Sequence, residues 1–157
     1  MTRRILAFAC GLAALSAFVP EAQAQIKPGL HLARAADSFD GVNGVGGSVE
    51  VGLPILPVDL FVAAEYFFPS CDDCSFWGGS ADVHFTLPVP LVKPYAAAGL
   101  VMRNTEASDT EVSTEGLGFG AGVNVSALVV GAYAEGRYEL MDGSEDQLVF
   151  RLGLRFE

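Results

Sequence analysis

The feature that most constrains the fold is an alternation of apolar and polar residues that runs through most of the chain after residue 24. In LGFGAGVNV, residues 117–125, Leu, Phe, Ala and Val alternate with Gly and Asn. A period of two is that of a β-strand whose two faces meet different surroundings. Because no segment keeps a helical period of 3.6 for three turns, we predict an all-β fold.

Eight segments carry the alternation. The predicted strands cover about 28–36, 45–53, 60–68, 78–87, 94–103, 116–125, 129–140 and 147–156, each close to the ~9–11 residues that a tilted strand needs to cross a bilayer. The connections after the second, fourth and sixth strands are short (PILPVD, PVPLVK, SAL). Those after the other four are polar and mostly longer (DSFDGVNG, SCDDCSFW, NTEASDTEVSTE, MDGSED). Outer-membrane barrels have this asymmetry between tight periplasmic turns and longer outer loops, and an even strand number places both termini in the periplasm.

The polar faces carry charges of both signs, which suits a narrow lumen, where an unpaired charge would cost several kcal/mol. The residues predicted to form a lumen charge network are Glu50, Glu65, Asp82, His84, Arg103, Glu135, Arg137, Glu139, Arg151 and Arg155. Glycines on the same faces leave room for these long side chains. Aromatic residues near strand ends suit interfacial girdles; they are Tyr66, Phe68, Phe76, Trp77, Tyr138 and Phe156.

We therefore predict an eight-stranded antiparallel up-and-down transmembrane β-barrel with a polar lumen and an apolar exterior. A soluble periplasmic lipocalin-like binding barrel, which reverses the two faces, is the alternative. Two residues fit the membrane assignment poorly. Arg34 shares the lipid face if His31 points inward, so it must lie at the outer rim or follow a bulge. Tyr95 points inward together with Arg103, away from any girdle, and a bulge is the one explanation that the pattern offers.

The first 24 residues have the three parts of a secretory signal peptide. Arg3 and Arg4 precede an apolar run over 5–19, and Ala22-Gln23-Ala24 forms a small-residue cleavage site. The run is short for a membrane anchor helix, so we expect residues 1–24 to be removed, leaving a barrel domain of residues 25–157. Removal of two arginines and one glutamate changes the formal charge from −10 to −11. A chain this acidic is not expected to bind nucleic acid.

Two cysteines remain after processing, Cys71 and Cys74, in PSCDDCSFW. Export places them in an oxidising compartment, where a short-range disulfide is expected. A metal site would need further ligands, and the chain has only two histidines. A redox-active pair is disfavoured because Asp72 and Asp73 would raise the thiol pKa, and free thiols are the remaining alternative.

Several segments resemble those of a known family. They are KPYAAAGL, GLGFGAGVNV followed by VVGAYAEGRYEL, and LVFRLGLRFE. In this order they resemble the small eight-stranded outer-membrane β-barrels of Gram-negative bacteria, in the opacity-protein and OmpA/OmpX-like group. The resemblance implies contact with outer-membrane lipid and lipopolysaccharide, and insertion by the barrel-assembly machinery, with Phe156 as the C-terminal assembly signal. The family commonly ends on that aromatic residue, whereas Glu157 follows it here.

The resemblance implies no shared chemistry. It implies a role in envelope integrity, or in adhesion to a surface or host partner through the outer loops. Some such barrels are lipid A deacylases or palmitoyltransferases, and the one compact candidate set here is Ser80, Asp82 and His84. Successive residues on one face of a strand lie about 6.6 Å apart, so these three form a row rather than a converging triad. We expect no catalysis, no cofactor and no metal site. Narrow passage of a solute or hydrophobic compound is the alternative function, although side chains fill an eight-stranded barrel.

Overall fold

The computed structural model describes residues 25–37, 41–53, 57–71, 74–107, 110–127 and 129–156. The predicted signal peptide and Glu157 lie outside these residues. The strands are β1 (Gln25–Ala35), β2 (Val42–Gly52), β3 (Val58–Phe67), β4 (Cys74–Thr86), β5 (Val92–Ala107), β6 (Thr110–Ala127), β7 (Val130–Met141) and β8 (Gln147–Phe156).

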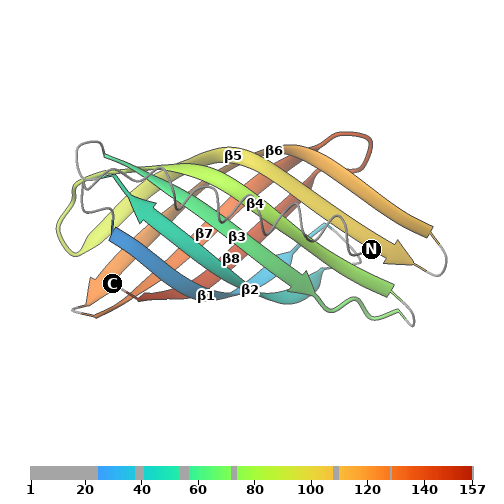
Figure 1. Ribbon diagram of the computed structural model, residues 1–157, viewed down its shortest axis with the longest axis horizontal. Coiled ribbons are helices and arrows are strands. Elements are labelled where there is room, and N and C mark those ends of the chain that lie inside the picture. The colour runs from blue at the N-terminus through green and yellow to red at the C-terminus, as the bar shows by residue number, and fades with distance from the viewer. Residues whose placement is uncertain are drawn as a thin grey trace.

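All eight strands are antiparallel and follow one another in chain order around a closed barrel, in which β1 also pairs with β8 (Figure 1). The predicted fold class and strand order are confirmed. No helix within the described residues is long and apolar enough to cross a membrane.

The strand ends differ from the prediction at one side of the barrel. NTEASDTEVSTE was expected to form a loop, and this is wrong: β5 and β6 remain paired until Ala107 faces Thr110. Thr105, Val112 and Thr114 explain the difference, since β-branched residues favour strands even among acidic neighbours. Similarly, β4 begins at Cys74, inside the predicted loop SCDDCSFW. The neighbouring strands β4, β5 and β6 therefore extend together at one end of the barrel. This end, where β1, β3, β5 and β7 finish, is called the loop end.

The strand pairing contains no bulge at Arg34 or Tyr95, the two residues that fitted the membrane assignment poorly. Pairing of β1 with β2 is continuous from Gln25 opposite Gly52 to Ala35 opposite Val42. Arg34 lies one residue from the C-terminal end of β1, is exposed, and donates a hydrogen bond of 3.0 Å to Asn43 Oδ1. It therefore lies at the rim of the barrel. The β5 strand likewise keeps its register past Tyr95.

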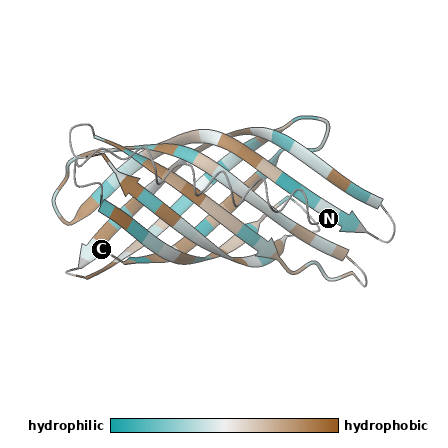
Figure 2. Ribbon diagram, in the orientation of Figure 1, coloured by the Kyte–Doolittle hydropathy of each residue, from teal (hydrophilic) through white to brown (hydrophobic). Residues whose placement is uncertain are grey.

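Hydrophobic and hydrophilic residues alternate along the strands (Figure 2), and the two faces of the sheet have opposite character. In β8, Leu152 is 62% exposed and its neighbour Arg151 is 2% exposed. Large apolar side chains likewise point outward from the other seven strands, whereas charged side chains in the middle of the wall, such as Glu65 and Arg137, are buried. An apolar exterior around a charged interior is the arrangement of a membrane barrel, and it contradicts the lipocalin-like alternative.

Candidate functional site

The lumen is the candidate site, and an apolar layer on β1–β4 and β8 covers part of its loop end. This layer consists of Ala33, Ala35, Val42, Phe67, Phe76 and Val149, all buried. The Phe67 and Phe76 rings stack with their centroids 4.7 Å apart. The assignment of Phe76 to the interfacial girdle is therefore wrong. Because β4 begins at Cys74, Phe76 shares the inward face with Ser80, whereas Trp77 points outward and is 41% exposed.

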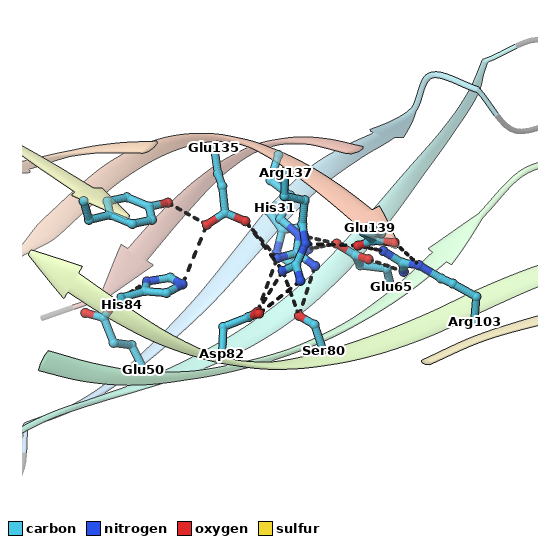
Figure 3. A network of polar contacts seen from close by, with 12 residues as sticks. His31, Glu50, Glu65, Ser80, Asp82, His84, Arg103, Glu135, Arg137 and Glu139 are labelled. Carbon is cyan, nitrogen blue, oxygen red and sulfur yellow. Dashed lines mark hydrogen bonds and ion pairs between the residues drawn. The ribbon is translucent and has the colours of Figure 1, made fainter. Parts of the chain in front are cut away.

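A network of ion pairs fills the middle of the lumen (Figure 3). Arg103 bridges two strands on opposite sides of the barrel. Its Nη1 lies 2.6 Å from Glu65 Oε2 of β3, and its Nη2 lies 2.6 Å from Glu139 Oε1 of β7. All three side chains are almost completely buried, so this cation neutralises carboxylates that water does not reach.

Arg137 forms a bidentate pair with Asp82. Its two terminal nitrogens lie 2.7 and 3.0 Å from the carboxylate oxygens, and its Nε lies 3.0 Å from Glu139 Oε1. Two parallel N–H···O bonds to one carboxylate are among the strongest neutralising contacts in proteins. A Cβ at Gly118 would overlap the Arg137 guanidinium. The glycine on the lumen face of β6 therefore makes room for the arginine of β7.

Arg151 connects the last strand to the third. Its Nε lies 2.5 Å from Glu65 Oε1, its Nη1 lies 3.0 Å from Glu135 Oε1, and its Nη2 donates to Ser80 Oγ at 3.1 Å. His31 adds a contact of 3.2 Å between its Nε2 and Glu65 Oε1. Glu65 thus meets three basic side chains, and the network joins six of the eight strands.

An aromatic layer lies below the ions, towards the end with the short turns. The His84 ring stacks between Phe61 and Tyr95, 4.6 Å from each. Tyr95 donates a hydrogen bond of 2.9 Å to Glu135 Oε2, which accounts for its inward direction. Tyr133 completes the layer, with the Arg155 guanidinium carbon 4.7 Å from its ring centroid.

A small polar cavity of about 140 Å³ opens below the aromatic layer, and Arg155 lies at their boundary. Arg155 Nη1 is 2.5 Å from Glu50 Oε2. The cavity wall includes Lys27, Asp59 and Lys93. At the opposite end a second cavity of about 280 Å³ lies beside the apolar layer, between the β5–β6 hairpin and the β7–β8 turn, and reaches Arg103 of the ionic layer. The ionic and aromatic layers lie between these two cavities.

The structure buries all ten side chains of the predicted charge network, none more than 5% exposed. Seven meet in the ionic layer: Glu65, Asp82, Arg103, Glu135, Arg137, Glu139 and Arg151. His84, Glu50 and Arg155 lie below it, with His84 Nε2 3.7 Å from Glu135 and its Nδ1 3.8 Å from Glu50.

Sequence reasoning missed the inward aromatic residues Phe61, Phe67 and Tyr133. The signal was present in their spacing, since Phe61 and Phe67 share the face of Glu65, and Tyr133 shares that of Glu135. Ser80, Asp82 and His84 do lie along one face of β4. Ser80 Oγ accepts from two arginines while His84 stacks between rings, so the three make no nucleophile–base pair. The expected disulfide joins Cys71, in the β3–β4 connection, to Cys74, the first residue of β4.

No protein-family model matches the chain, and no curated protein sequence matches it. Several solved structures match the chain. Neisserial surface protein A superposes with a TM-score of 0.63 at 18% identity, over 83% of this chain and 94% of that one. The N-terminal β-barrel domain of Pseudomonas aeruginosa OprF gives 0.62 at 21% identity, over 85% and 98%. Ail, the attachment invasion locus protein of Yersinia pestis, gives 0.61 at 15% identity, over 85% and 96%.

Proposed function

We propose that this chain, which shares the fold of the small eight-stranded outer-membrane barrels, is an integral outer-membrane protein of structural or surface-interaction type without catalysis. The observation that carries the proposal is the filled lumen inside a lipid-compatible wall. Four arginines and five carboxylates are buried there, and seven of these nine form the ionic layer between the apolar and the aromatic layer. Side chains filling the middle of the lumen oppose free passage of a solute, and His84 stacks between Phe61 and Tyr95 instead of serving Ser80 as a base.

Residues 1–24 direct export, and both ends of the mature chain face the periplasm. The even number of strands supports this orientation, as does the long β5–β6 hairpin at the end of the barrel opposite both termini. Phe156 is the last described residue of β8, 45% exposed on the outer wall, where the barrel-assembly machinery would read it. Contacts with lipopolysaccharide and lipid cover the remainder of the wall.

The loop end carries the interaction role. Acidic side chains dominate it among the described residues: Asp37, Glu106, Glu111, Glu115, Asp142, Glu145 and Asp146. The names of two structures with the same fold, a surface protein and an attachment protein, support adhesion as the type of function. An acidic surface favours a basic partner.

Fractionation of cells that produce the full chain tests the proposal. The protein should sediment with outer membranes, migrate faster on gels before boiling than after, and lose its loop end to protease added to intact cells. A protein that is recovered in the soluble periplasm and migrates identically with and without boiling would refute membrane insertion. Protection of the loop end from external protease, in a membrane-inserted protein, would refute the orientation.

A further inference from the structure

The β4–β5 turn presents an apolar surface at the short-turn end of the barrel, where β2, β4, β6 and β8 finish. Every residue from 87 to 93 is exposed. Leu91, at 81%, is the most exposed large hydrophobic side chain of the described residues, and Leu87 and Val89 are also exposed. Figure 1 shows this turn as the yellow-green loop that projects at the left. Turns that face water are usually rich in Gly, Asn, Asp and Ser, which this turn lacks.

Leu91 adopts a backbone conformation that leucine normally avoids. Its φ is 68°, and Val92 N donates to Pro90 O at 2.9 Å, which closes a three-residue turn around it. Such a turn is rare and strained for a bulky residue. The other described residues with positive φ are Gly41 and Gly143 of the loop end, and glycine adopts this conformation freely. Because Leu91 packs so little against the described chain, a contact outside it is needed to offset the strain.

The height of the apolar wall places this turn at a membrane boundary. From Trp77 to Leu87 the chain advances ten residues along the outer face, which is about 34 Å of strand. At a tilt of ~40° this distance covers about 26 Å of membrane thickness, close to the ~25 Å apolar band of outer-membrane barrels. The band therefore ends at Leu87, and the turn beyond it lies between the lipid headgroups and the acyl chains.

Apolar side chains are exposed on several sides of the barrel at this end. Ile26 near the start of β1 is 65% exposed, and Val129 in the β6–β7 turn is 68% exposed. Because the strands follow one another around a closed barrel, these two residues and Leu91 lie on different sides of it. A protein partner would cover one side, whereas a lipid leaflet surrounds the barrel and contacts all three.

We infer that the β4–β5 turn is a membrane anchor, which inserts Val89 and Leu91 into the phospholipid leaflet at the short-turn end. The surface is continuous with the lipid-facing wall through Leu87. Lys93, which follows the turn, lines the polar cavity at the mouth instead, so the turn separates lipid from the lumen. Insertion of apolar side chains at the headgroup–acyl boundary fixes the depth of the barrel in the membrane. The inference rests on the proposed function, because it requires a barrel in the membrane.

Quenching of tryptophan fluorescence at different depths tests the contact. Val89→Trp in a Trp77→Phe background carries a single tryptophan in the turn, and the mature protein is refolded into phosphatidylcholine vesicles. Its emission should be blue-shifted, and lipids brominated near the headgroup should quench it more than lipids brominated near the chain end. Ser144→Trp in the same background, in the β7–β8 turn, is the control. It should be quenched by acrylamide from water and by neither lipid. Emission and quenching of Val89→Trp that match this control would overturn the anchor.

Two substitutions of Leu91 separate its apolar character from its backbone conformation. Leu91→Asn suits the left-handed backbone but places a polar amide at the boundary, whereas Leu91→Met keeps an apolar side chain there. In the Val89→Trp protein, Leu91→Asn should shift the emission to the red and increase quenching by acrylamide. Leu91→Met should leave both nearly unchanged. Heat-dependent gel migration verifies that each variant is folded. If Leu91→Asn also left the emission and quenching unchanged, Leu91 would not be the anchoring residue.

A second copy of the chain is the other occupant to be tested. A blue shift of Val89→Trp that appears only when the ratio of protein to lipid is raised would assign the turn to self-association and overturn the lipid contact. An inserted, heat-modifiable barrel whose Val89→Trp emits as in water would refute the anchor and leave the proposed function standing. A protein that neither inserts nor changes its migration on heating would refute the proposed function itself.

Discussion

Replacement of Arg137 by methionine should lower the free energy of unfolding by about 3–5 kcal/mol, the usual cost of removing one partner of a buried ion pair. Glu139 would keep Arg103 at 2.6 Å and Gln147 Nε2 at 2.6 Å. Asp82 would lose both of its short bonds, and its nearest remaining cation would be Arg151, with Nη1 at 3.9 Å. The loss therefore comes mainly from Asp82, left charged and almost unpaired in the lumen.

Neutralising Asp82 should reverse part of this loss. The double variant Arg137→Met/Asp82→Asn should recover about half of it, because no uncompensated charge remains at that point. Arg34→Met, at the exposed outer rim, is the control and should change stability by less than about 1 kcal/mol. Urea titration of protein refolded in lipid vesicles measures all three, with Trp77, the single tryptophan, as the fluorescent reporter. A free energy of unfolding for Arg137→Met within about 0.5 kcal/mol of that of the parent would refute the network. A double variant less stable than the single variant would refute it as well.

Three further outcomes follow from the same geometry. Gly118→Val should destabilise the barrel by about 1–3 kcal/mol or prevent folding, because its side chain would occupy the place of the Arg137 guanidinium; Gly136→Ala on the outer wall, with 3.4 Å to the Phe150 ring, should fold normally by gel migration. Trp77 fluorescence should be quenched by brominated lipids, and full protection would show that this wall does not face lipid. Planar-bilayer recordings of refolded protein should show no steady large conductance, and a wide, constantly open channel would contradict the filled lumen.

Much of the radial arrangement could be predicted from the sequence, because strand parity leaves few choices. Once Glu65 points inward, Phe61 and Phe67 must do so too. The error over Phe76 came from ranking residue type above parity: aromatic residues were assigned to the membrane interface, and the predicted strand began too late to include this one. The same parity accounts for Tyr95, whose hydroxyl has a carboxylate partner inside the lumen.

Contacts across the lumen could not be predicted in this way. Arg151 and Glu65 are separated by 86 residues, and their meeting depends on how strongly the strands tilt and stagger when the barrel closes. Strand ends were equally difficult, since Glu106 and Glu111 reduce the strand propensity of residues 104–115. Pairing with β5 along the hairpin outweighs that local preference, so β6 extends to Thr110.

The seam between β1 and β8, which pairs Gly29 with Arg155 and Ala35 with Val149, has a consequence for the time course of folding. Contacts between residues so far apart in the chain form slowly, because the entropy of a long loop is lost before any pairing energy is gained. Arg151 belongs to β8, so the Glu65 carboxylate stays hydrated until this last strand has paired. Dehydration of the ions and closure of the seam therefore belong to one cooperative event. A chain halted before that event presents two open sheet edges, and such an intermediate is prone to aggregate.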